Sequence, residues 1–188
     1  HCISEWGHDF RPEYMQIADI LPHLPGARLL ACTATATPVV RDEILERLGL
    51  PPDTPQHVRG FARPNLAFRV RETPGRGDRE RRVDEGLAET LGAPGAGRGT
   101  AIVYAPTRRQ TEEEAARLAA AGWNAAGYHA GMDGPVREAV QQAFADGRQE
   151  IVVATNAFGM GIDRADVRCL VHLAPPGSVE AYYQEAGR

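Results

Sequence analysis

Aromatic and basic side chains are concentrated near the start of the chain, in a segment whose glycine and proline disfavour a helix. Trp6, His8 and Phe10 occupy alternate positions, and Arg11 follows directly. In an extended backbone, alternate side chains point to the same side, so three rings would line up beside a cation. Such a row can stack on flat ligands, most commonly nucleic-acid bases. A half-buried edge strand with aromatic core residues is the alternative, and these residues alone leave both open.

Further polar groups directly follow predicted strands, where ligands bind in open α/β sheets. They are the hydroxyl-rich residues 33–36, the arginines within 105–109 and the loop 155–163. In the last of these, Gly159 and Gly161 permit close backbone approach or a positive φ. The loop could hold phosphates through its amides or bind a ribose through its terminal carboxylate, although a tight turn is the simpler explanation when the loop is read alone.

Short apolar runs alternate with helical patterns, which is typical of α/β layering around a mainly parallel sheet. A domain boundary is expected at about 61–65, followed by five strands and about four helices in one doubly wound domain. The expected strands are 28–32, 56–61, 66–70, 100–105, 125–129, 150–155 and 168–173. The expected helices are 37–48, 78–91, 107–121, 135–145 and 178–187.

Composition excludes several kinds of chemistry. All 21 basic residues are arginine, so no lysine can act as a Schiff base or in a phosphate-binding loop. The net charge of −4 means that any nucleic-acid contact must come from local patches. The three cysteines are far apart, which argues against a zinc site or a disulfide framework and fits a reducing cytosol. Because the apolar runs are short, we expect a cytoplasmic protein without a membrane span.

In their order and spacing, these residues resemble the RecQ-type DNA helicases of helicase superfamily 2. His1 resembles the last residue of the DEAH motif, and residues 4–14 resemble the aromatic-rich loop of that family. The remaining matches are motif III at 33–35, the hinge between two RecA-like domains at 61–65, motif IV at 101–108, the segment after it at 128–132, motif V at 151–163 and the start of motif VI at 182–188.

The resemblance implies an α/β fold of RecA-like parallel sheets flanked by helices, with the end of the first RecA-like domain at 1–62 and most of the second at 63–188. It implies part of an ATP-dependent 3′–5′ DNA helicase of recombination and repair, which uses ATP and Mg²⁺ and binds single-stranded and duplex DNA. The family's phosphate loop, the acidic residues before His1 and a second arginine after Arg188 are not in this sequence. We therefore expect the chain to need the missing half of the first domain as a partner and to be inactive alone.

The resemblance also assigns roles to single residues. In this family ATP binds between the two domains, and an arginine of the second domain faces the γ-phosphate. Arg188 is the candidate in this sequence, and the second arginine of the family's motif VI is the alternative. The implied catalytic residues are His1, Gln184 and Arg188; the implied nucleotide-binding residues are Thr33, Thr35, Gly161 and Asp163; the implied DNA-binding residues are Trp6, His8, Phe10, Arg11, Arg63, Arg108, His129 and Thr155. No metal ligand is predicted, and His172 is expected to be an ordinary surface or core histidine.

Two alternatives remain open. The chain could be a non-catalytic nucleic-acid-binding module, or part of an RNA helicase of the same superfamily. Read without the resemblance, Gln184, Glu185 and Arg188 would be an ordinary solvated face of the last helix.

Overall fold

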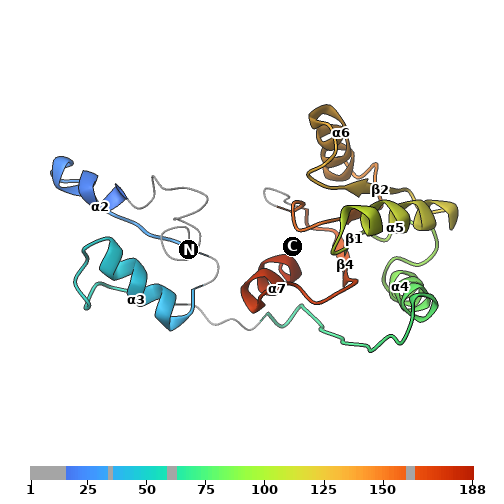
Figure 1. Cartoon of the computed structure of the whole chain (residues 1–188), viewed down its shortest axis with the longest axis horizontal. Coiled ribbons are helices and arrows are strands. Elements are labelled where there is room, and N and C mark those ends of the chain that lie inside the picture. Colours follow the sequence, from blue (N-terminus) through green and yellow to red (C-terminus); the bar gives the residue numbers. More distant parts are fainter. Residues whose placement is uncertain (1–15, 34–35, 59–62, 160–163) are drawn as a thin grey trace. The chain divides into compact units, whose positions relative to one another are not determined.

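The computed structural model describes residues 16–33, 36–58, 63–159 and 164–188 (Figure 1). Internal contacts divide the chain into two compact units, His1–Arg69 and Val70–Arg188, and each is considered by itself. This division falls a few residues after the domain boundary that the family resemblance implies between residues 62 and 63, and that boundary stays a prediction.

In the described part of the first unit, the regular elements are helices joined by turns and irregular segments. It contains α2 (Ile17–Ile20), the 3₁₀-helix η2 (Leu21–His23) and α3 (Pro38–Arg47). The side chain of Thr37 caps α3 by accepting a hydrogen bond from the amide of Val40 at 3.3 Å, and a proline occupies the first turn. Val40 and Leu48 are buried on one face of this helix. The helix predicted at 37–48 is therefore confirmed.

Three predicted strands are wrong within the described residues. Residues 28–32, 56–58 and 66–70 form no strand. A strand requires ladder hydrogen bonds to a neighbour, and the described residues provide no partner strand for these segments. Most of their apolar side chains are exposed, with Leu30 at 87% and Val70 at 85%, while Leu66 is half-buried. Short apolar runs were therefore not sufficient to make these strands.

The second unit contains a four-stranded parallel sheet of order β2-β3-β1-β4. Its elements are α4 (Arg76–Leu91), β1 (Thr100–Tyr104), α5 (Arg108–Ala120), β2 (Ala125–Tyr128), α6 (Gly134–Ala145), β3 (Ile151–Ala154), β4 (Val167–His172) and α7 (Val179–Ala186). Each matches a predicted element to within about two residues. Because 66–70 is not a strand, the sheet has four strands where five were predicted.

Helices cover both faces of this sheet, as a doubly wound fold requires. On one face, α4 buries Val83, Leu87 and Leu91, the stripe predicted for it, in a core shared with α5. On the other face, Phe144 of α6 packs with Phe158. All residues of the central strand β1 are buried. No helix in the described ranges is long and apolar enough to cross a membrane.

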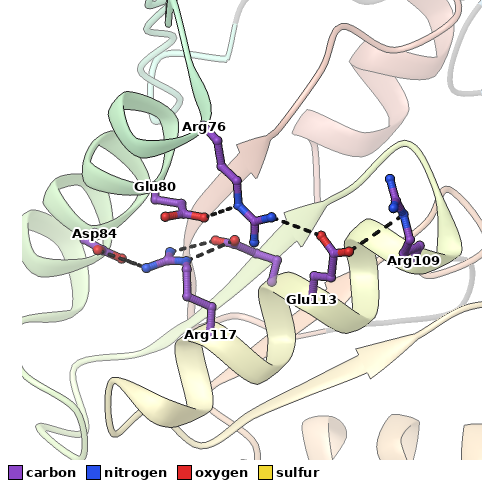
Figure 2. Close-up of polar contacts among 7 residues, drawn as sticks. Arg76, Glu80, Asp84, Arg109, Glu113 and Arg117 are labelled. Carbon is purple, nitrogen blue, oxygen red and sulfur yellow. Dashed lines mark hydrogen bonds and ion pairs between the residues drawn. The ribbon is translucent and has the colours of Figure 1, made fainter.

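Charged side chains connect α4 to α5 (Figure 2). Arg117 pairs with Glu114 at 2.7 Å and with Asp84 of α4 at 2.9 Å. The side chains of Glu114 and Arg117 are only 8% and 20% exposed. The hydrogen bonds that Arg117 donates to Glu114 help to hold the pKa of Arg117 above its ordinary value. A second, more exposed pair joins Arg76 to Glu80 at 2.7 Å, and Arg76 also approaches Glu113 of α5 at 3.5 Å.

Replacing Arg117 by methionine is expected to lower the free energy of unfolding by about 2–3 kcal/mol, because Glu114 would remain buried without its partner. The matched change Arg76→Met removes an exposed arginine from the same helix pair and should have a much smaller effect. Urea denaturation of the three proteins measures the difference. Equal midpoints for the two variants would contradict this interpretation.

Candidate functional site

The carboxyl ends of β1, β3 and β4 meet at one edge of the sheet, because these strands are parallel and adjacent. Tyr104, the last residue of β1, is in register with Ala154 on one side and His172 on the other. The backbone continues this pairing past Tyr104, since Ala105 donates to Ala154 and Tyr104 accepts from Leu173. The segments that follow β3 and β4 therefore begin on either side of Tyr104, at the end of β1.

The loop after β3 lies directly over Tyr104. The Tyr104 hydroxyl donates a hydrogen bond to the backbone oxygen of Phe158 at 3.2 Å. The next residue, Gly159, has a φ of +118°, as its predicted freedom allows. A Cβ placed on Gly159 would lie 2.9 Å from Tyr104 Oη and 3.0 Å from Arg188 Nε. Only a glycine therefore lets these two side chains approach the loop so closely.

Arg188 brings a guanidinium group to this edge from the end of α7, drawn in red in Figure 1. Its Nε is buried and has no hydrogen-bond partner among the described residues. Burial raises the pKa of Tyr104 to about 12, and the positive charge of Arg188 opposes that shift. Tyr104 is therefore a protonated donor at neutral pH, while Arg188 keeps an unsatisfied donor beside a glycine loop. This combination suits an anionic ligand.

His172 and Glu185 connect α7 to the sheet. His172 Nε2 lies 2.7 Å from Glu185 Oε2. The His172 ring stacks on Tyr104, with centroids 5.2 Å apart and planes 20° apart, and it also contacts Tyr182 of α7. His172 thus has a satisfied, mostly buried side chain, as expected of a core histidine, and it connects the strand end to the helix that precedes Arg188.

A second polar group lies at the ends of β1 and β2. His129 is buried, with Nε2 3.0 Å from Glu112 Oε1 and with no partner for Nδ1 among the described residues. Arg108, exposed at the start of α5, lies so close to Gly131 that a Cβ there would be 2.7 Å from its Nη1. An exposed arginine and an unsatisfied ring nitrogen in one loop region are suited to phosphate contact.

The other predicted site residues are placed individually. Thr155 is half-buried at the end of β3, and its amide donates to Tyr128 at 3.2 Å. Gln184 is half-buried on α7, one helical turn before Arg188. In the first unit, Thr33 is half-buried and Arg63 is exposed. The remaining predicted site residues lie outside the described residues: His1, Trp6, His8, Phe10, Arg11, Thr35, Gly161 and Asp163.

Comparison with known proteins gives one matching family. The family described as "Helicase conserved C-terminal domain" matches residues 86–188, which include the whole sheet and α7. Among solved structures, S. cerevisiae Dbp5 bound to RNA and ADP BeF3 aligns with a TM-score of 0.73 at 16% identity, over 99% of this chain and 46% of that chain. This similarity confirms the RecA-like α/β fold that the motifs predict.

Curated relatives match over the whole chain. The ATP-dependent DNA helicase RecQ of Haemophilus influenzae is 39% identical over 188 residues, which is 29% of its length. The ATP-dependent DNA helicase Q-like 2 of Arabidopsis thaliana is also 39% identical, over 26% of its length. The chain thus spans less than a third of either relative. These matches confirm the resemblance to RecQ-type helicases.

Proposed function

Because this chain belongs to the helicase conserved C-terminal domain family, we propose that it forms part of an ATP-dependent DNA helicase in which Arg188 faces the γ-phosphate of ATP. The observation that carries the proposal is the guanidinium of Arg188 beside Gly159, at the carboxyl edge of the sheet and with its Nε unsatisfied. Ligands of open α/β sheets bind at this edge.

The chemistry of this residue fits a phosphate. In a helicase, hydrolysis of ATP supplies the free energy for movement along DNA. In the transition state of this reaction, negative charge spreads over the oxygens of the transferring phosphoryl group. A planar, permanently charged guanidinium matches several oxygens at once, which an ammonium group cannot do. Gly159 leaves room for the group, and Gln184 is on the same helix to orient toward the nucleotide. Thr33, Thr35, Gly161 and Asp163 are proposed to contact the nucleotide, and His1 to belong to the acidic motif for Mg²⁺.

DNA is proposed to contact the loops around His129 and Arg108, together with Thr155 and Arg63. The exposed guanidinium of Arg108 and the unsatisfied nitrogen of His129 support phosphate contacts there. Trp6, His8, Phe10 and Arg11 are proposed to stack on and pair with single-stranded DNA, which suits a motor because stacking tolerates any sequence. Translocation in the 3′–5′ direction and a role in recombination and repair are proposed from the RecQ resemblance. A cytoplasmic location is proposed from the widely spaced cysteines and the short apolar runs.

Binding and hydrolysis by the 188-residue chain test this proposal together. We expect it to bind a fluorescent single-stranded DNA with strong salt dependence, and to release no phosphate from ATP because it has no lysine for a phosphate loop. Robust DNA-stimulated phosphate release by this chain would contradict that account. Tighter binding of an RNA of the same sequence would favour an RNA helicase. If residues 1–188 replace the matching segment of a RecQ relative and the resulting protein does not hydrolyse ATP, the chain would be better explained as a non-catalytic binding module.

Replacing Trp6 by alanine is expected to weaken single-stranded DNA binding by about 5- to 150-fold, the equivalent of about 1–3 kcal/mol for one stacked base. Fluorescence anisotropy at fixed salt measures the dissociation constant. Phe68→Ala, which removes an exposed aromatic outside the predicted DNA-binding residues, is the control. Equal affinities for the Trp6 variant and the unchanged chain would rule out base stacking by this residue.

A further inference from the structure

We infer that His172 and Glu185 are positioning residues, and that their hydrogen bond holds α7 on the end of β4 so that Arg188 lies over Gly159. The consequence for ATP hydrolysis rests on the proposed function. The placement of Arg188 itself depends only on residues of this chain.

The first support is the place of this hydrogen bond in the fold. His172 ends β4, and Glu185 lies in the last turn of α7, one turn before Arg188. The hydrogen bond therefore joins the last residue of β4 to the last turn of α7, across the whole segment between them. Its atoms are 2.7 Å apart, and the two side chains are only 13% and 12% exposed. In such a site a hydrogen bond to a carboxylate is stronger than in water, because little water competes for it.

The second support is what surrounds Arg188. Its Nε finds no hydrogen-bond partner among the described residues, so a bond from that atom does not fix the guanidinium. The backbone amide of Arg188 donates to the Glu185 carbonyl at 3.4 Å. The position of Arg188 is therefore coupled to Glu185, whose side chain binds His172. The position of the helix end therefore sets where the side chain of Arg188 starts, and the interaction of Arg188 with Tyr104 adds to its placement.

The third support is continuity from α7 to the glycine loop. The His172 ring stacks on Tyr104, and Tyr104 donates to the Phe158 carbonyl directly before Gly159. One series of contacts thus runs from Glu185 through His172 and Tyr104 to the loop under Arg188. A shift of His172 would move both the arginine and the surface it lies on.

Two variants separate the hydrogen bond from packing. His172→Gln keeps an N–H donor that can reach Glu185, and His172→Leu keeps a similar volume without a donor. Both remove the stacked ring, so ring stacking does not contribute to their difference, which reports the effect of a polar N–H donor. Glu185→Met removes the acceptor instead, at nearly unchanged length. His57→Leu, at an exposed histidine of the first unit, is the control.

Nuclear magnetic resonance of the 188-residue chain gives the readout. We expect a nuclear Overhauser effect between Arg188 Hε and the Tyr104 ring in the unchanged chain, the His57 control and His172→Gln. It should be lost in His172→Leu and Glu185→Met, with exchange of Arg188 Hε with solvent faster by about tenfold or more. Urea denaturation shows which variants remain folded.

Persistence of this effect in a folded His172→Leu or Glu185→Met chain would overturn the inference, and if one variant fails to fold the other decides. Loss of the effect in His172→Gln as well would also overturn it, because packing alone would then place the arginine. The readout contains no nucleotide. Failure of Arg188 to act in ATP hydrolysis would therefore leave this result unchanged, so the two failures are distinguishable.

Discussion

Replacement of Arg188 by alanine is expected to lower DNA-stimulated ATP hydrolysis by about 10³-fold or more. The measurement uses a chimera in which residues 1–188 replace the matching segment of the RecQ helicase of Haemophilus influenzae, which is similar along the whole chain. The physical reason is that a guanidinium beside the transferring phosphoryl group stabilises charge that develops only in the transition state. The loss should therefore appear in kcat.

Two further variants make this test specific. Arg109→Ala removes an exposed arginine that pairs with Glu113 at 3.7 Å on the surface of α5, and its activity should be unchanged. Arg188→Lys keeps the charge but loses the planar fork, so it should restore only a small part of the activity. Equal hydrolysis by the Arg188→Ala and Arg109→Ala chimeras would contradict the proposed role.

Replacement of Gly159 by alanine is expected to lower hydrolysis in the same chimera by about 10²-fold, because a misplacement of about 1 Å near the reacting group has effects of that size. The new Cβ would lie 2.9 Å from Tyr104 Oη and 3.0 Å from Arg188 Nε, so at least one of these side chains must move. The φ of +118° also strains alanine, and we expect a loss of about 1–3 kcal/mol in unfolding free energy.

Gly86→Ala is the matched control for this variant. Gly86 lies inside α4, and a Cβ there meets no atom within 4 Å. This change should raise the free energy of unfolding by about 0.5–1 kcal/mol and leave hydrolysis unchanged. Hydrolysis by Gly159→Ala equal to that of the control would show that Arg188 does not need its place over the loop.

The sheet of the second unit was predictable because its signals are local and strong. The apolar runs at 100–104 and 151–154 are buried throughout, as central parallel strands are. The stripe of Val83, Leu87 and Leu91 likewise specified the buried face of α4. The segments 28–32 and 66–70 are also largely apolar, but each contains an arginine and at most one β-branched residue, and the described residues give them no neighbouring strand. Composition reports a preference for strand, whereas pairing depends on another segment.

The site was predictable only in part, for a related reason. Motif resemblance singled out Arg188, Arg108 and His129, and the glycine pattern indicated a close approach at Gly159. The role of His172 could not be read from the sequence, because its contacts join residues from β1, β4 and α7. Strand order decides that Tyr104 lies between Ala154 and His172, and no local pattern contains that order. The one signal in the sequence was that His172 lies near the end of a predicted strand, next to other predicted site residues.

A structure of the chimera with single-stranded DNA and a non-hydrolysable ATP analogue tests the central claim most directly. The account predicts a guanidinium nitrogen of Arg188 at about 3 Å from an oxygen of the γ-phosphate, with Gly159 beneath it. A γ-phosphate bound by another arginine, with Arg188 turned away from the nucleotide, would contradict it.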